Sequence, residues 1–107
     1  MFTAEMAREN AEKVSEKVEK IVVLAEKNIE EWSKQGAETI TLNFVNMKIG
    51  KVGCGKIRYE LENKRGYYCV VLVKKNAIKI KLGWGDNNLF CASVEHELYK
   101  DDVWEVV

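Results

Sequence analysis

The sequence predicts an α+β protein in which one long N-terminal helix packs on one face of a roughly five-stranded antiparallel meander sheet. Three observations predict this fold class. The first 35 residues contain no glycine or proline and are rich in alanine, glutamate and lysine, which favour helices. After Gly36 the apolar residues recur at every second position, the period of a strand. The stretches between these strands are too short for crossover helices, so neighbouring strands are expected to run antiparallel.

The chain of 107 residues is expected to form a single domain, with the long helix over 1–36, the sheet over 37–100 and a C-terminal segment over 101–107. No apolar run reaches the roughly 18 residues that cross a membrane. The N-terminus lacks the basic and apolar regions of a signal peptide. We therefore expect a cytoplasmic protein that does not engage a membrane.

The predicted helix covers residues 4–35, with Thr3 as its N-cap and Gly36 as the residue that ends it. A seam with alternating steps of three and four residues runs along it, which is typical of a coiled coil. The seam consists of Ala4, Ala7, Ala11, Val14, Val18, Ile21, Ala25, Asn28 and Trp32.

A helix of this length spans about 48 Å, whereas a six-residue strand spans about 20 Å. Its N-terminal half must therefore overhang the sheet or bend back. We expect the overhang to pair with a second subunit and form a homo-oligomer. The predicted oligomer interface consists of Ala7, Ala11, Val14 and Val18. The alternative is a monomer whose long helix frays at its start.

Four alternating segments and one continuously apolar segment predict the strands of the sheet. The strands are expected over residues 38–47, 57–62, 67–73, 78–82 and 89–98. The loop before the fourth strand is expected to hold three residues, Lys75 to Ala77. This loop length sets the register and predicts one apolar face beneath the helix. That face includes Ile57, Tyr59, Leu61, Tyr68, Val70, Leu72, Ile78, Ile80 and Leu82.

Charge is sorted along the chain although its sum is zero. Residues 48–81 carry ten bases against two acids, and residues 82–107 carry six acids against one base. Because basic clusters attract anions, the second face of the sheet is the predicted binding surface. The predicted binding residues are Arg58, Arg65, Tyr67, Lys79, Lys81 and Trp84. Two alternatives stay open: the lysines form an ordinary solvated face, or the acidic C-terminal segment folds back and neutralises them.

No motif typical of catalysis, metal binding or cofactor binding is found in the sequence. Cys54, Cys69 and Cys91 form no CxxC pair, and the one histidine, His96, excludes a two-histidine metal site or a catalytic triad. Cys54 is expected to be the most exposed thiol. The segment 50–56 looks like a phosphate loop, but a strand is predicted after it where a helix N-terminus is needed. We therefore expect no metal, no cofactor and no enzyme activity.

These observations predict a non-enzymatic binding or inhibitor-type protein that engages an acidic protein partner through its basic sheet face. The alternative is a protein that binds or sequesters an anionic metabolite or nucleotide between subunits, near Arg65, Tyr67 and Trp84. Nucleic acid is the less favoured partner because the C-terminal part of the chain is acidic.

Overall fold

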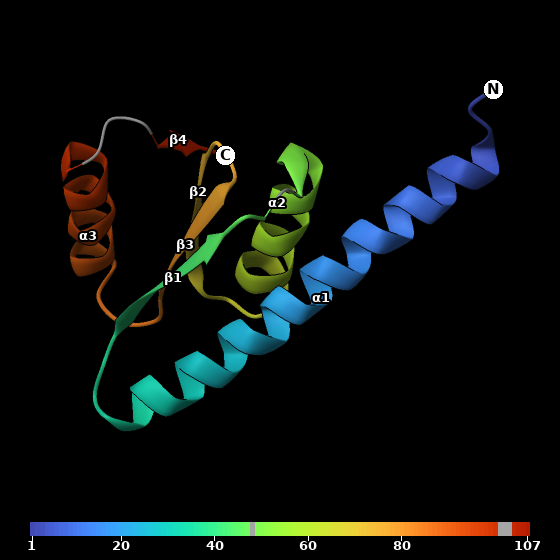
Figure 1. Ribbon diagram of the computed structural model, residues 1–107. Helices are drawn as coiled ribbons and strands as arrows, with labels where there is room; N and C mark the ends of the chain where they lie inside the picture. The colour runs from blue at the N-terminus through green and yellow to red at the C-terminus, as the bar shows by residue number, and fades with distance from the viewer. Residues whose placement is uncertain (48, 101–103) are drawn as a thin grey trace.

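The computed structural model describes residues 1–47, 49–100 and 104–107 (Figure 1). The protein is α+β, as predicted, with a long N-terminal helix and an antiparallel sheet. Within these described residues the sheet has four strands rather than five. The elements in chain order are α1 (Ala4–Lys34), β1 (Thr39–Val45), α2 (Gly50–Arg58), the π-helix η1 (Tyr59–Lys64), β2 (Tyr68–Lys74), β3 (Ala77–Gly83), α3 (Asn87–Lys100) and β4 (Glu105–Val106).

The sheet lies between two helical layers. Its strands follow the order β1-β3-β2-β4, and each neighbouring pair is antiparallel. Helices α1 and α2 cover one face, and α3 covers the other (Figure 1). The predicted meander order is wrong, because β1 pairs with β3 and the segment that follows β1 is helical. The main core fills the space beneath α1 and α2, and includes Val18, Ile21, Val22, Ala25, Ile29, Cys54, Ile57, Leu61, Cys69, Val71, Ile78, Ile80 and Leu82.

The long helix α1 begins and ends where local signals predict. The side-chain oxygen of Thr3 accepts a hydrogen bond from the Met6 backbone N–H at 3.2 Å. Gly36 follows the helix with a φ of 89°, a conformation that glycine adopts without strain. Residues 4–13 are all exposed, and burial starts near Val14. The N-terminal part of α1 therefore projects beyond the body of the protein, as predicted from its length (Figure 1).

The predicted strand over 57–62 is wrong, because this segment forms the end of α2 and the π-helix η1. Ile57 and Leu61 are fully buried, whereas Tyr59 between them is 53% exposed. Burial thus follows a four-residue helical spacing, which the alternating apolar pattern concealed. Gly53 lies where α2 approaches α1: a Cβ there would be 2.9 Å from Ile49 Cβ and 3.2 Å from a Val14 methyl group. Packing against α1 therefore selects the helix over the strand.

The predicted strand over 89–98 is also wrong, because it forms most of α3. Its buried and half-buried residues recur at helical spacing, and include Phe90, Ser93, Val94, Glu97 and Leu98. The Phe90 ring stacks on Tyr68 with 5.6 Å between ring centroids. At the start of α3, Asp86 accepts a hydrogen bond from the Asn88 N–H at 2.8 Å, as an N-terminal carboxylate is expected to do.

The β2–β3 turn holds two residues, Lys75 and Asn76, instead of three. Asn76, the second of these residues, has a positive φ of 66°, a conformation that asparagine tolerates better than most residues. The register pairs Cys69 with Leu82 and Val71 with Ile80. The predicted inner face of β2 is therefore inverted: its odd-numbered residues face α1 and α2, and its even-numbered residues face α3. A change of one residue in the turn moves every side chain of a strand to the other face.

Candidate functional site

The sheet face predicted to bind a partner is covered by the C-terminal part of the chain. Lys79 Nζ lies 2.7 Å from Glu97 Oε2, and their side chains are only 13% and 16% exposed. The same ammonium group lies 4.7 Å from the centroid of the Trp104 ring. Lys81 is 5% exposed, and desolvation by burial lowers its pKa. The structure therefore matches the alternative in which C-terminal residues neutralise the basic face from within the molecule.

The other predicted binding residues do not form one surface with these lysines. Arg58 pairs with Glu62 at 2.7 Å on an exposed side of the helix. Tyr67 and Trp84 are half-buried and pack against the core. Arg65 alone among the six lines the groove described below.

The residues predicted to form an oligomer interface divide into two groups. Ala7 and Ala11 are exposed on the overhang of α1. Val14 packs against the core, and Val18 is 5% exposed within it. The seam is therefore continuous in sequence, but its members Val14, Val18, Ile21 and Ala25 pack against the protein's own core.

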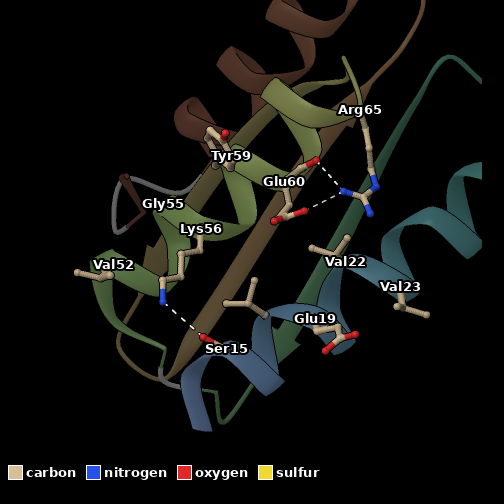
Figure 2. Close-up of a pocket in the computed structure, with 11 residues that line it drawn as sticks. Ser15, Glu19, Val22, Val23, Val52, Gly55, Lys56, Tyr59, Glu60 and Arg65 are labelled. Carbon is tan, nitrogen blue, oxygen red and sulfur yellow. Dashed lines mark hydrogen bonds and ion pairs between the residues drawn. The ribbon is translucent and has the colours of Figure 1, made fainter. Parts of the chain in front are cut away.

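A groove of about 720 Å³ runs between α1 and the α2–η1 segment (Figure 2). Its apolar surface comes from both helices. Val23, Val52 and Tyr59 are 62%, 74% and 53% exposed there. Large apolar side chains gathered in an open groove are uncommon on a monomer's surface and are typical of interaction sites. The full lining is Ser15, Val18, Glu19, Val22, Val23, Val52, Gly55, Lys56, Tyr59, Glu60 and Arg65.

Helix α2 presents two different faces because of its residue spacing. Gly53, Cys54 and Ile57 are buried against the core. Val52, Gly55 and Tyr59, spaced by three and four residues, form a stripe that lines the groove. We call Val52, Gly55 and Tyr59 the outer stripe of α2.

Gly55 is the one glycine in the chain that the fold does not explain. Gly36, Gly50 and Gly66 have positive φ, and a Cβ on Gly53, Gly83 or Gly85 would come within 3.0 Å of another residue. A Cβ on Gly55 would meet nothing within 4 Å, and its φ is negative. Glycine inside a helix costs about 1 kcal/mol relative to alanine. Glycine also allows another backbone to approach closely. At Gly55 such an approach is open from the groove side.

Four charged residues line the groove, Glu19, Lys56, Glu60 and Arg65, and the last two are in ion pairs. Arg65 binds both Glu26 and Glu60, with 3.0 Å between Arg65 Nη1 and Glu60 Oε2 (Figure 2). Hydrogen bonds from Lys64 and Arg65 lower the pKa of Glu60. Across the groove, Lys56 Nζ lies 3.5 Å from the Ser15 hydroxyl, a weak contact.

The α2 side of the groove is basic. Lys51 and Lys56 are exposed, and residues 50–58 include no acid. No ion pair to Lys51 or Lys56 is found within the described ranges. Of these two lysines, Lys56 lines the groove, whereas Lys51 lines a separate hollow.

A smaller hollow of about 300 Å³ lies beside the start of α2. The segment 50–56 begins a helix, so the reason for setting a phosphate loop aside is overturned. The polar side chains that line the hollow, Lys51, Lys74, Lys75 and Asn76, are all exposed. We therefore take the groove between α1 and α2 as the candidate site.

The cysteines offer no reactive nucleophile in the core. Cys54 is 1% exposed, so the prediction that it is the most exposed thiol is wrong; Cys91 is the exposed one. Burial raises the pKa of Cys54 and raises that of Cys69 to about 12. A thiol attacks as its thiolate, so both buried cysteines are unreactive at neutral pH. The described part of the chain contains no cluster of three or more histidine, cysteine or acidic residues that could hold a metal ion.

Comparisons with protein-family models, with curated proteins and with solved structures found no match. None of the helices within residues 1–47, 49–100 and 104–107 has the length and apolar character needed to cross a membrane.

Proposed function

We propose that the protein is a non-enzymatic binding protein that takes an amphipathic helix of another polypeptide into the groove between α1 and α2. The observation that carries the proposal is Gly55, a helix-interior glycine on an open apolar groove with no use within the fold. Helix-in-groove recognition needs an apolar floor and a place where the two backbones come close.

The groove supports a helix better than a small ligand. Its apolar residues lie along two helices, and the outer stripe of α2 repeats at three- and four-residue steps. A partner helix that contacts this stripe with its own i, i+3 and i+7 residues repeats the same spacing. Of the two cations that line the groove, Arg65 is already held by two carboxylates, which leaves Lys56 for a small anionic ligand.

The charge around the groove indicates the chemistry of the partner. Lys56 lines the groove on the α2 side, and no ion pair to it is found within the described ranges. A partner helix with a glutamate or aspartate next to its apolar stripe complements this lysine, and such charges mainly increase association rate and specificity. The proposed partner is thus acidic, and the cation that meets it lies on α2 rather than on the sheet.

A photo-reactive residue in place of Val52 tests the proposal in the cells that express the protein. Val52 is 74% exposed, so this substitution does not disturb the core. Peptide mapping of the crosslinked partner identifies the segment bound, which is expected to be an acidic amphipathic helix. The same photo-reactive residue at Glu95, which is exposed on α3 over the other face of the sheet, is the control.

The identified segment is then made as a synthetic peptide, and its Kd is measured with purified variants. Gly55→Leu fills the groove and is expected to weaken binding about tenfold or more, whereas Glu95→Leu leaves it unchanged. Equal binding by Gly55→Leu, with its helix content intact by circular dichroism, would overturn the proposal. A bound mass of a few hundred daltons in native mass spectrometry, displaced by Gly55→Leu, would instead favour the anionic small molecule.

A further inference from the structure

The strand β1 lies at an edge of the sheet and lacks the features that usually protect an edge. Within the described residues, β3 is the only strand paired with β1. Its seven residues, TITLNFV, include no charge, no proline and no glycine. Natural proteins protect exposed edges with lysine, proline or bulges. Here the lysines of the sheet are on β2 and β3, and β1 has none.

The ladder with β3 determines which backbone groups of β1 point outward. The Trp84 N–H donates to the Glu38 carbonyl at 3.0 Å, in the same register as the β1–β3 pairs. Hydrogen-bonded pairs alternate in an antiparallel ladder, so Ile40, Leu42 and Phe44 bond to β3. The N–H and C=O groups of Thr39, Thr41, Asn43 and Val45 therefore point to the open edge.

We propose that β1 pairs with β1 of a second copy, antiparallel across a two-fold axis at Leu42, and forms a homodimer with one continuous sheet. In this register the outward-pointing residues of one strand meet those of the other, since Thr39 lies opposite Val45 and Thr41 opposite Asn43. The pairing adds about eight backbone hydrogen bonds, two for each such pair.

The side chains fit this register on both faces. Ile40, Leu42 and Phe44 are half-buried, so each has exposed apolar surface at the edge. The two-fold axis places Ile40 opposite the second copy's Phe44. It also places the two Leu42 side chains opposite each other. On the other face Thr41 meets Asn43, and no like charges are opposed. Apolar cross-strand pairs of this kind stabilise antiparallel sheets.

The helix α1 carries a second part of the same interface. Val23 lies on the flank of α1 that faces α2 across the groove. Leu24, which is 42% exposed, is turned about 100° around α1 from Val23, away from α2, and both residues line a hollow of about 540 Å³ on the outer side of α1. Leu24 is ten residues, about 15 Å, from the end of α1, and Leu42 is about 10 Å into β1, which runs back along the helix (Figure 1). Counted from the α1–β1 connection, the two leucines are therefore about 15 Å and about 10 Å along elements that run in opposite directions.

Charge on this flank is complementary about Leu24. Lys17 and Glu31 are seven residues, about two turns, before and after it. Two antiparallel α1 helices centred on Leu24 place each Lys17 opposite the second copy's Glu31. In the part of the chain that the structure describes, neither residue has an ion-pair partner within its own molecule. The grooves of both copies lie on the other flank and stay open.

Light scattering on size-fractionated protein at a series of concentrations tests the dimer. The wild type is expected at twice the chain mass of 12.3 kDa. Leu24→Glu is expected to be monomeric, whereas Val23→Glu, its neighbour on the groove flank, is expected to remain dimeric. Thr41→Pro removes an outward N–H without touching the β3 ladder and is also expected to be monomeric, with Thr41→Val as its dimeric control.

Amide hydrogen exchange gives a readout that does not depend on how a variant folds. In the wild-type dimer, the outward amides of Thr41 and Asn43 are expected to be protected as strongly as that of Leu42. In Leu24→Glu, of these three amides only that of Leu42 is expected to stay protected. A wild type that is monomeric at every concentration, or rapid exchange at Thr41 and Asn43 in a dimer, overturns the inference. Loss of this dimer leaves helix binding in the groove unaffected, so the two proposals fail separately.

Discussion

Two glycines on the same helix are expected to respond in opposite ways to the same substitution. Gly53 and Gly55 are two residues apart in α2, and both have negative φ. Alanine is favoured over glycine inside a helix by about 1 kcal/mol, mainly because glycine loses more backbone entropy on folding. The contacts that the new methyl group makes determine whether the substitution stabilises or destabilises the protein as a whole.

At Gly55 no neighbouring atom opposes the gain in helix stability that alanine brings. Its Cβ would have no neighbour within 4 Å, so Gly55→Ala is expected to raise the free energy of unfolding by about 0.5–1 kcal/mol. For a domain of this size, 1 kcal/mol corresponds to about 4–8 °C in Tm.

At Gly53 the same methyl group meets two residues. The Cβ would lie 2.9 Å from Ile49 Cβ, which is attached directly to the backbone, and 3.2 Å from Val14 Cγ1. Overpacking of this kind costs about 1–3 kcal/mol. Gly53→Ala is therefore expected to lower stability by up to about 2 kcal/mol after the helix gain is included.

Thermal and urea unfolding followed by circular dichroism measure both values. If Gly55→Ala is no more stable than the wild type, Gly55 has a structural role and loses its value as evidence for a partner. If Gly53→Ala is stabilised as much as Gly55→Ala, the close approach of α1 and α2 described above is wrong. A stabilised Gly55→Ala that binds the partner less well would show that glycine is kept for binding at the expense of stability.

Three further predictions concern the cover over the second sheet face and the thiols. Glu97→Gln leaves the mostly buried Lys79 without its ion pair and is expected to destabilise the protein by about 1–3 kcal/mol in urea unfolding. The control Glu95→Gln, on the exposed side of α3, is expected to change stability by less than about 0.5 kcal/mol. Equal effects of the two substitutions would contradict the ion pair. A thiol reagent at pH 8 is expected to label Cys91 in the folded protein, and Cys54 and Cys69 only after unfolding; rapid labelling of all three would contradict their burial. Because burial raises the pKa of Cys69 from 9.0 to about 12, the native state keeps a proton that the unfolded state releases, and stability is lost as the pH rises from about 9 to about 12. Between pH 8 and pH 10 the free energy of unfolding of the wild type is expected to fall by about 1 kcal/mol more than that of Cys69→Ala. Equal decreases in the two proteins would refute this prediction.

The candidate groove was beyond sequence reasoning for a specific reason. The stripe of Val52, Gly55 and Tyr59 is visible in the sequence only if residues 50–64 are recognised as helical. The local signals there are three glycines and an alternation at Ile57, Tyr59 and Leu61, and both favour turns and strands. The helical signals in this segment are the spacing of Cys54, Ile57 and Leu61 and the Val52–Lys56–Tyr59 spacing beside Gly55.

Local interactions determined the parts of the fold that the sequence predicted correctly. The long helix follows from residue propensities, the Thr3 cap and the Gly36 end, all of which act within a few residues. Its length required it either to overhang the sheet or to bend back, and the structure has the overhang. The strands near 38–47, 67–73 and 78–82 follow from their alternation or from a continuous apolar run, and they form β1, β2 and β3.

Only the tertiary structure decided the helical state of residues 57–62 and 89–98, the face of β2 and the accessibility of the basic residues. In each case two arrangements have similar local free energies, and contacts distant in the sequence select one of them. Helix α2 packs on α1 where Gly53 lies close to Val14, a residue 39 positions earlier in the sequence. Lys79 can be buried because Glu97, eighteen residues later, pairs with it. Residue type sets the charge of a lysine, but only long-range packing determines whether a partner can reach it.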